Sequence, residues 1–176
     1  MRLNRLRQRL YSVLLVMPAA VLAQSAPEQA LKAAFIHNFA LFTEWPAAAL
    51  PPAARLCICV PPGSALGAAL TELEIPAVRG HQVLIKTRNS SLNLRNCHIL
   101  LLDAQDRPEL EQLRQTLQGA SVLTVSDSAE PLPGDAIIML AVSGDKRIVF
   151  DIDLTAAHQA QLSLSSKLLR LARNIE

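Results

Sequence analysis

Several residue types and motifs that enzyme and nucleotide-binding sites need are scarce or missing in this sequence. Its 176 residues include only 6 glycines, and no G-x-G-x-x-G or Walker loop can be assembled from them, which argues against nucleotide chemistry. Aromatic residues make up 3% of the chain, too few for a stacking site that binds sugars or bases. The 4 histidines form no His-x-x-x-His or Glu-x-x-His pair, and Gly-x-Ser-x-Gly is absent. We therefore expect neither an enzyme nor a cofactor-binding protein.

The first 23 residues have the parts of a secretory signal peptide. Four arginines and no acidic residue precede an apolar run at residues 10–22. Val21 and Ala23 supply the −3 and −1 positions of a cleavage site before Gln24. The apolar run is shorter than the ~20 residues that cross a bilayer, which disfavours a membrane anchor. We expect residues 1–23 to be removed and residues 24–176 to act outside the cytoplasm.

Removal of the leader reverses the sign of the net charge. The leader carries four of the 17 basic residues and none of the 15 acidic ones, so the exported chain has 13 basic and 15 acidic residues. A net charge of −2 gives no clustered basic face for nucleic acid or for an anionic membrane surface. About 150 residues suffice for one hydrophobic core and little more, so we expect a single domain.

Strand-like and helix-like segments alternate along the chain. Short apolar runs predict strands at residues 55–60, 82–87, 97–102, 121–125, 136–141 and 147–152. Helical spacing and capping residues predict helices at residues 27–43, 65–73, 107–118 with Asp106 as the cap, and from 155 onward with a break near 162–164 and a final turn capped by Ser165. Ser143-Gly144-Asp145 is a hairpin-length turn between the last two strands. The pattern predicts an α/β three-layer sandwich: a mostly parallel mixed sheet with a C-terminal antiparallel hairpin and helices on both faces.

The three cysteines fall on two predicted strands. Cys57 and Cys59 are two residues apart, so their side chains share a face, and Cys97 begins a strand that could lie beside theirs. A disulfide persists in an oxidising compartment, and either Cys57 or Cys59 could pair with Cys97. Zinc bound by the cysteines and His98 would need neighbouring strand residues to point the same way, so we expect no metal site.

Trp45 and Asp103 are the other candidate contacts with a ligand or partner. Trp45 is the only tryptophan and follows the first predicted helix, where it would anchor an interface or close the core beneath Pro46. Asp103 ends a predicted parallel strand, a place where open sheets bind ligands. An aspartate between a strand and a helix is also ordinary turn chemistry.

Four segments, taken in order, resemble the YfiR family of periplasmic proteins. They are residues 32–46 (KAAFIHNFALFTEWP), 97–102 (CHILLL), 122–127 (VLTVSD) and 160–172 (AQLSLSSKLLRLA). The resemblance spans essentially the whole chain after the leader. Asp153 stands where the family pattern has Asn, Gln161 stands where it has Gly, and the second cysteine pair of some members is missing.

The resemblance implies a regulator. YfiR-like proteins bind the periplasmic part of an inner-membrane diguanylate cyclase and hold its cytoplasmic domain inactive, and an outer-membrane lipoprotein can draw the repressor away. They thereby couple envelope stress or redox state to cyclic di-GMP and biofilm formation. The alternative function is a periplasmic sensor without a cyclase partner, which binds a small ligand near Asp103 and Ser126.

The resemblance also implies that Cys59 pairs with Cys97. Cys57 is then the odd cysteine, and three interpretations compete. It is an inert buried thiol, a redox thiol that exchanges with Cys59 for the partner, or a link to a second molecule that would make a homodimer.

Overall fold

The structure is a computed structural model that describes residues 25–89, 91–128, 134 and 136–176. The predicted leader, residues 1–23, lies outside the described residues. Within the described part of the chain, no helix has the length and apolar character needed to cross a bilayer.

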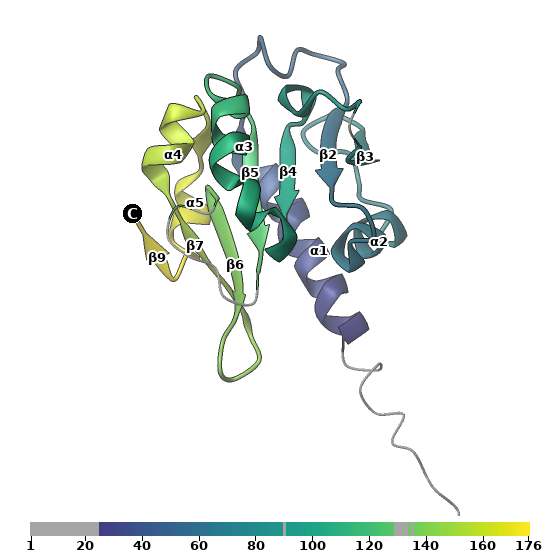
Figure 1. The fold of residues 1–176 in the computed structure, drawn as a ribbon, viewed down its shortest axis with the longest axis vertical. Coiled ribbons are helices and arrows are strands. Elements are labelled where there is room, and N and C mark those ends of the chain that lie inside the picture. The colour runs from purple at the N-terminus through teal and green to yellow at the C-terminus, as the bar shows by residue number, and fades with distance from the viewer. Residues whose placement is uncertain (1–24, 90, 129–133, 135) are drawn as a thin grey trace, which may run out of the picture.

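A seven-stranded mixed sheet runs through the centre of the molecule (Figure 1). Its strands are, in spatial order, β3 (Val83–Thr87), β2 (Leu56–Val60), β4 (Ile99–Leu102), β5 (Leu123–Asp127), β6 (Ile138–Val142), β7 (Ile148–Ile152) and β9 (Asn174–Ile175). The first five strands are parallel, β7 is antiparallel to β6, and β9 is parallel to β7. The predicted mostly parallel sheet with a C-terminal antiparallel hairpin is therefore confirmed.

Helices cover both faces of the sheet, as predicted for a three-layer sandwich. On one face, a large buried cluster includes residues of α1 (Ser25–Phe42), α2 (Ala65–Glu72), α4 (Leu154–Gln159) and α5 (Ser166–Leu169). On the other face, α3 (Leu110–Leu117) packs its leucines against a smaller cluster that contains all three cysteines. Figure 1 shows α3 in front of the strands and α1 crossing behind them.

The packing of α1 combines an apolar stripe with one buried ion pair. Ile36, Phe39 and Ala40 are fully buried at the spacing of a helix that faces a core. Lys32, one turn before Ile36, bonds Asp127 at 2.7 Å and Glu28 at 2.8 Å. Burial by itself would lower the pKa of the Lys32 ammonium, but the two carboxylates outweigh it and raise the pKa. Lys32 therefore stays charged and ties α1 to the end of β5.

The entry into α3 differs from the sequence prediction. A 3₁₀ turn, η2 (Ala104–Glu109), precedes α3, and Asp103 is its cap. The Asp103 carboxylate accepts from the Gln105 amide at 2.8 Å, and the Asp106 carboxylate accepts from the Asp103 amide at 2.9 Å. This is a capping box, so the prediction of Asp106 as the cap was wrong by three residues. Both aspartates suit a cap, and the sequence alone did not separate them.

Short strands were also missed. β1 (Thr43–Glu44) and β8 (Ser163–Leu164) form a two-stranded antiparallel sheet. β9, also two residues long, adds an edge strand to the main sheet beside β7. Two residues carry no periodicity from which a strand could be predicted. The break near 162–164 is confirmed, since it holds β8, and the Ser165 hydroxyl caps α5 by accepting from the Leu168 amide at 3.3 Å.

Gly67→Ala is expected to destabilise the fold, because α2 touches β2 at this glycine. A Cβ at Gly67 would lie 2.9 Å from Cγ2 of Val60, which is 4% exposed and β-branched. Overpacking of this kind costs roughly 1–3 kcal/mol, more than alanine gains as a helix former. Urea unfolding measures the loss.

The matched control is Gly144→Ala at the tip of the β6–β7 hairpin, where an added Cβ meets nothing within 4 Å. We expect the unfolding free energy of this variant to stay within about 0.5 kcal/mol of that of the parent. Equal stability of Gly67→Ala and the parent protein would show that α2 can move away from β2.

Candidate functional site

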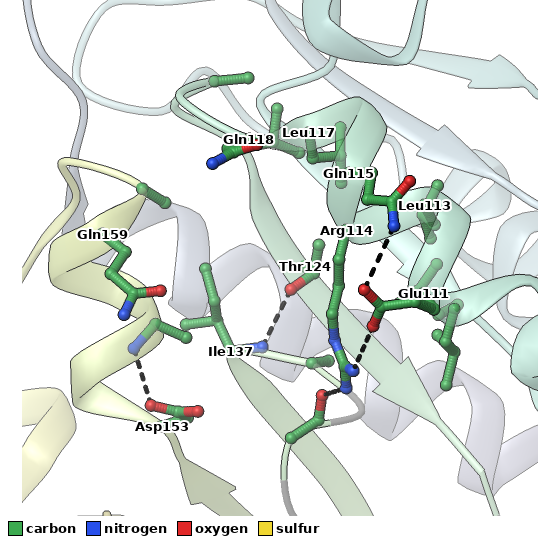
Figure 2. A pocket seen from close by; sticks show the side chains of 18 of the residues that line it. Glu111, Leu113, Arg114, Gln115, Leu117, Gln118, Thr124, Ile137, Asp153 and Gln159 are labelled. Atoms are coloured by element: carbon green, nitrogen blue, oxygen red, sulfur yellow. Dashed lines mark hydrogen bonds and ion pairs between the residues drawn. The ribbon is translucent and has the colours of Figure 1, made fainter.

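A groove of about 990 Å³ opens between α3 and α4 (Figure 2). Its floor is the sheet around the start of β5 and β6, with Val122 and Thr124 beside Ala136 and Ile137. One wall is α3 with the turn after it, and the other is α4. Small side chains leave the space open, because alanines line it from several segments: Ala120, Ala136, Ala156 and Ala160.

The two charged side chains that α3 contributes to the groove are already hydrogen-bonded. The Arg114 guanidinium bonds Glu111 at 3.4 Å and donates to the Gly134 carbonyl. The Glu111 carboxylate also accepts from the side-chain amide of Gln115 at 3.4 Å. These bonds tie the α3 wall to the segment before β6 and leave no spare charge on that wall.

The polar groups of the floor and of the α4 wall serve the backbone. The Thr124 hydroxyl accepts from the Ile137 amide at 2.9 Å, and the Asp153 carboxylate caps α4 by accepting from the Ala156 amide at 2.7 Å. Figure 2 shows Gln159 facing the α3 wall across the groove. The groove therefore offers an apolar floor rimmed by uncharged amides, Gln115, Gln118 and Gln159. Such a surface suits the docking of a protein or ligand better than acid–base chemistry.

The disulfide joins Cys59 on β2 to Cys97 just before β4, the pair that the family resemblance implies. Their Cα atoms are 5.9 Å apart, within the usual range, and the bond closes a loop across 38 positions. Among the described residues, no cluster of three or more potential ligands is placed to hold a metal ion.

Cys57 is a free, buried thiol beside this bond. Its Sγ lies 3.8 Å from that of Cys59. Burial raises the pKa of the Cys57 thiol, although Lys86 opposes the shift. Since the thiolate is the attacking species in disulfide exchange, burial favours the inert interpretation over the redox one. A link to a second molecule would require the strand to open first, because Cys57 is only 6% exposed.

Trp45 and Asp103 lie at opposite ends of β4. Trp45 is half-buried against the large core cluster, and its indole N–H donates to the His98 carbonyl at the amino end of β4, at 3.3 Å. Asp103 follows the carboxyl end of β4 and caps η2. Neither residue lines the groove. Their roles as contacts stay predictions.

The sequence did not reveal the groove. Its lining comes from segments between Leu102 and Ala160, and the exposed glutamines of α3 look like any solvated helix face. No motif marks alanines that face an open space, so only the fold brings them together.

The fold is a small α/β domain with an open groove between α3 and α4. Residues 29–173 match the profile of the YfiR/HmsC-like family (DUF4154), and the chain belongs to this family. No curated protein matches the chain. The chain is also similar to the crystal structure of a conserved domain protein from Vibrio cholerae O1 biovar El Tor, with 14% identity and a TM-score of 0.49. The match covers 84% of this chain but 60% of that one, so this chain spans less than two thirds of the length of the chain it matches.

Removal of the disulfide is expected to cost about 4 kcal/mol of unfolding free energy, because the chain-entropy model gives roughly that value for a loop of this length. Cys97→Ala should show the full loss, and Cys57→Ala a much smaller one. Chemical unfolding measures both. The double variant Cys59→Ala/Cys97→Ala prevents new pairing with Cys57. A larger loss from Cys57→Ala than from Cys97→Ala would contradict the assignment.

Proposed function

We propose that this protein is a periplasmic regulator that binds the periplasmic domain of an inner-membrane diguanylate cyclase and represses its synthesis of cyclic di-GMP. The match to the YfiR/HmsC-like family over residues 29–173 is the observation that carries the proposal. Residues 1–23 direct export and are removed, and residues 24–176 act in the periplasm. An outer-membrane lipoprotein draws the regulator away from the cyclase and so links envelope stress to biofilm formation.

Within this proposal, the groove between α3 and α4 is the surface that binds the cyclase. Its apolar floor and amide rim match the apolar centre and polar rim of protein interfaces. Glu111 and Arg114 pair with each other, and the Asp153 carboxylate is hydrogen-bonded to the backbone of α4, so each charged group of the groove already has a partner within the protein. A docking role needs no catalytic group, which agrees with a regulator rather than an enzyme.

The disulfide makes the groove sensitive to the redox state of its surroundings. Leu110, Leu113 and Leu117 of α3 pack on the cluster that contains Cys59 and Cys97. Because α3 is also one wall of the groove, loss of the bond would loosen that wall and weaken binding of the cyclase. Reduction in the periplasm would then release the cyclase from repression.

Deletion of the gene is expected to raise cyclic di-GMP and biofilm in the host, because the cyclase loses its repressor. Quantification of cyclic di-GMP in extracts and crystal-violet staining measure the two effects. Complementation with the parent gene should restore both values. Unchanged levels in the deletion strain would contradict repression.

A charge placed in the groove should weaken binding of the cyclase domain at least about tenfold, because desolvation of an unpaired guanidinium is costly. Gln115→Arg adds that charge on the groove side of α3, where Gln115 is exposed. Titration calorimetry or biolayer interferometry with the purified periplasmic domain measures the affinity.

Gln112→Arg is the matched control, since it makes the same change on an exposed residue of the same helix outside the groove lining. It should bind like the parent. Equal affinity of all three proteins would place the interface elsewhere, and equal weakening by both variants would point to net charge instead of the groove.

The second candidate function is a periplasmic sensor of a small ligand without a cyclase partner. The volume of the groove, about 990 Å³, falls within the range of small-molecule sites. The strand ends near Asp103 and Ser126 are less suited, because Asp103 caps η2 and Ser126 is 3% exposed. A metabolite that raises the melting temperature would favour this function, since ligands that bind only the folded state stabilise it.

A further inference from the structure

A strap, residues 45–55, connects β1 to β2 and passes over the amino ends of the parallel strands (Figure 1). It contains neither helix nor strand, and Ala53 has the left-handed φ of 65° that costs a residue other than glycine conformational energy. Its turns are held by backbone bonds to Pro46 and Pro51. Side chains must therefore fix the strap to the sheet.

Two histidine rings make that attachment. His98, at the amino end of β4, bonds the Ala49 carbonyl through Nε2 at 3.1 Å. His81, just before β3, bonds the Ala54 carbonyl through Nδ1 at 2.8 Å. The strap adds contacts of its own, since Trp45 and Leu50 pack on the large core cluster. Trp45 also donates to the His98 carbonyl, and its indole packs edge-on to the His98 ring, with the ring centroids 6.2 Å apart.

The hydrogen bonds of His98 allow only one protonation state. Its Nδ1 accepts the amide proton of Cys57 at 2.9 Å, so Nδ1 carries no proton. A neutral imidazole then carries its proton on Nε2, and Nε2 faces the Ala49 carbonyl, which needs a donor. A proton added at Nδ1 would face the Cys57 N–H and leave that buried amide without an acceptor.

We propose that His98 is a proton-operated latch: the neutral ring joins the strap to β2, and protonation of Nδ1 breaks the bond to the Cys57 amide, so that the strap loses this attachment to β2. Both bonds to the strap stay in place, because Nε2 of His98 is already the donor to Ala49 and Nδ1 of His81 is the donor to Ala54. Acid therefore breaks the bond between the His98 ring and β2, while the ring keeps its bond to Ala49. The ring and the bound Ala49 segment of the strap would then move away from the Cys57 amide together.

The surroundings of His98 oppose its protonation. Burial lowers its pKa, the bond to Ala49 opposes that shift, and the charge of nearby His81 adds to it. The Cys57 thiol on β2 is neutral, since burial raises its pKa, and Cys97 is in the disulfide. The charged groups at this end of the sheet are exposed: Arg55 on the strap, Arg95 before β4, and the pair Glu44–Arg79. No described carboxylate bonds the ring of His98 to stabilise its cation.

The direction of the pH effect follows from this lowered pKa. As pH falls below 6.5, the ordinary pKa of histidine, the unfolded chain takes up the proton before the folded protein does. Stability from the neutral latch is complete above that pH and is lost as pH falls through the lower pKa of folded His98. His37 on α1 contributes in the same direction, because burial lowers its pKa too.

Fluorescence of Trp45, the only tryptophan, reports the latch directly. In the disulfide-bonded protein, we expect a one-proton change of emission with a midpoint below pH 6.5, while far-UV circular dichroism stays native. His98→Asn keeps an acceptor for the Cys57 amide but cannot be protonated, so the change should disappear. Hydrogen exchange should show the Cys57 amide losing protection over the same pH range only in the parent.

The histidine controls separate the latch from general acid effects. His158→Gln, on an exposed residue of α4, and His37→Gln should keep the emission change with the same midpoint. Emission that is constant between pH 7.5 and 4.5, or a change that persists in His98→Asn, would overturn the proposal. If His98→Asn does not fold, the imidazole ¹⁵N spectrum of the parent protein tests the proposal instead. A protonated Nδ1 on His98 at neutral pH would overturn the proposal.

Discussion

The whole fold depends on how β2 is joined to β4. These strands pair at only two register positions, whereas β2 and β3 pair at five and β4 and β5 at four. The order of the strands in the sheet also reverses here, since β3 lies on one side of β2 and β4 on the other. Each half of the sheet would separate most easily at this short ladder, so additional bonds across it determine whether both halves act as one layer.

A disulfide, hydrogen bonds and apolar packing reinforce this ladder. The Cys59–Cys97 disulfide crosses it covalently on the face that α3 covers. His98 crosses it with two bonds to Cys57, from its amide to the Cys57 carbonyl at 2.8 Å and from the Cys57 amide to its ring. On the opposite face, Ile58 and Ile99 are fully buried beneath the helices. The chemistry of this junction is unusually sensitive to conditions, because it combines a reducible bond with a ring that gains a proton in acid.

In the proposed function, this arrangement connects the environment of the protein to the docking surface. The α3 wall of the groove packs on the cysteine cluster, and the strap passes over the amino ends of the same strands. The proposed release of a partner under stress needs a fold with a defined weak point. The β2–β4 junction supplies one, and the antiparallel β6–β7 pair, with five register positions and no cysteine, lies apart from it.

The sequence predicted the layers of the fold well and gave no sign of the groove. Apolar runs such as residues 97–102 locate strands because burial on both faces demands them, and Gly144 with Asp145 marks the hairpin. The pairing of Cys59 came from family likeness, since Cys57 shares its face. The groove could not be predicted because it depends on the distance between α3 and α4, which arises from packing far apart in the sequence. The latch was hidden for the same reason: Ala49 and Cys57 meet His98 only in the folded protein.

Amide hydrogen exchange of the oxidised and the reduced protein tests the central role of the junction most directly. With the disulfide reduced under otherwise native conditions, β2, β4 and α3 should lose protection first, while the β6–β7 hairpin keeps its slow exchange. A uniform loss across all strands, or no change in β2 and β4, would contradict the view that this short ladder is the point on which the fold depends.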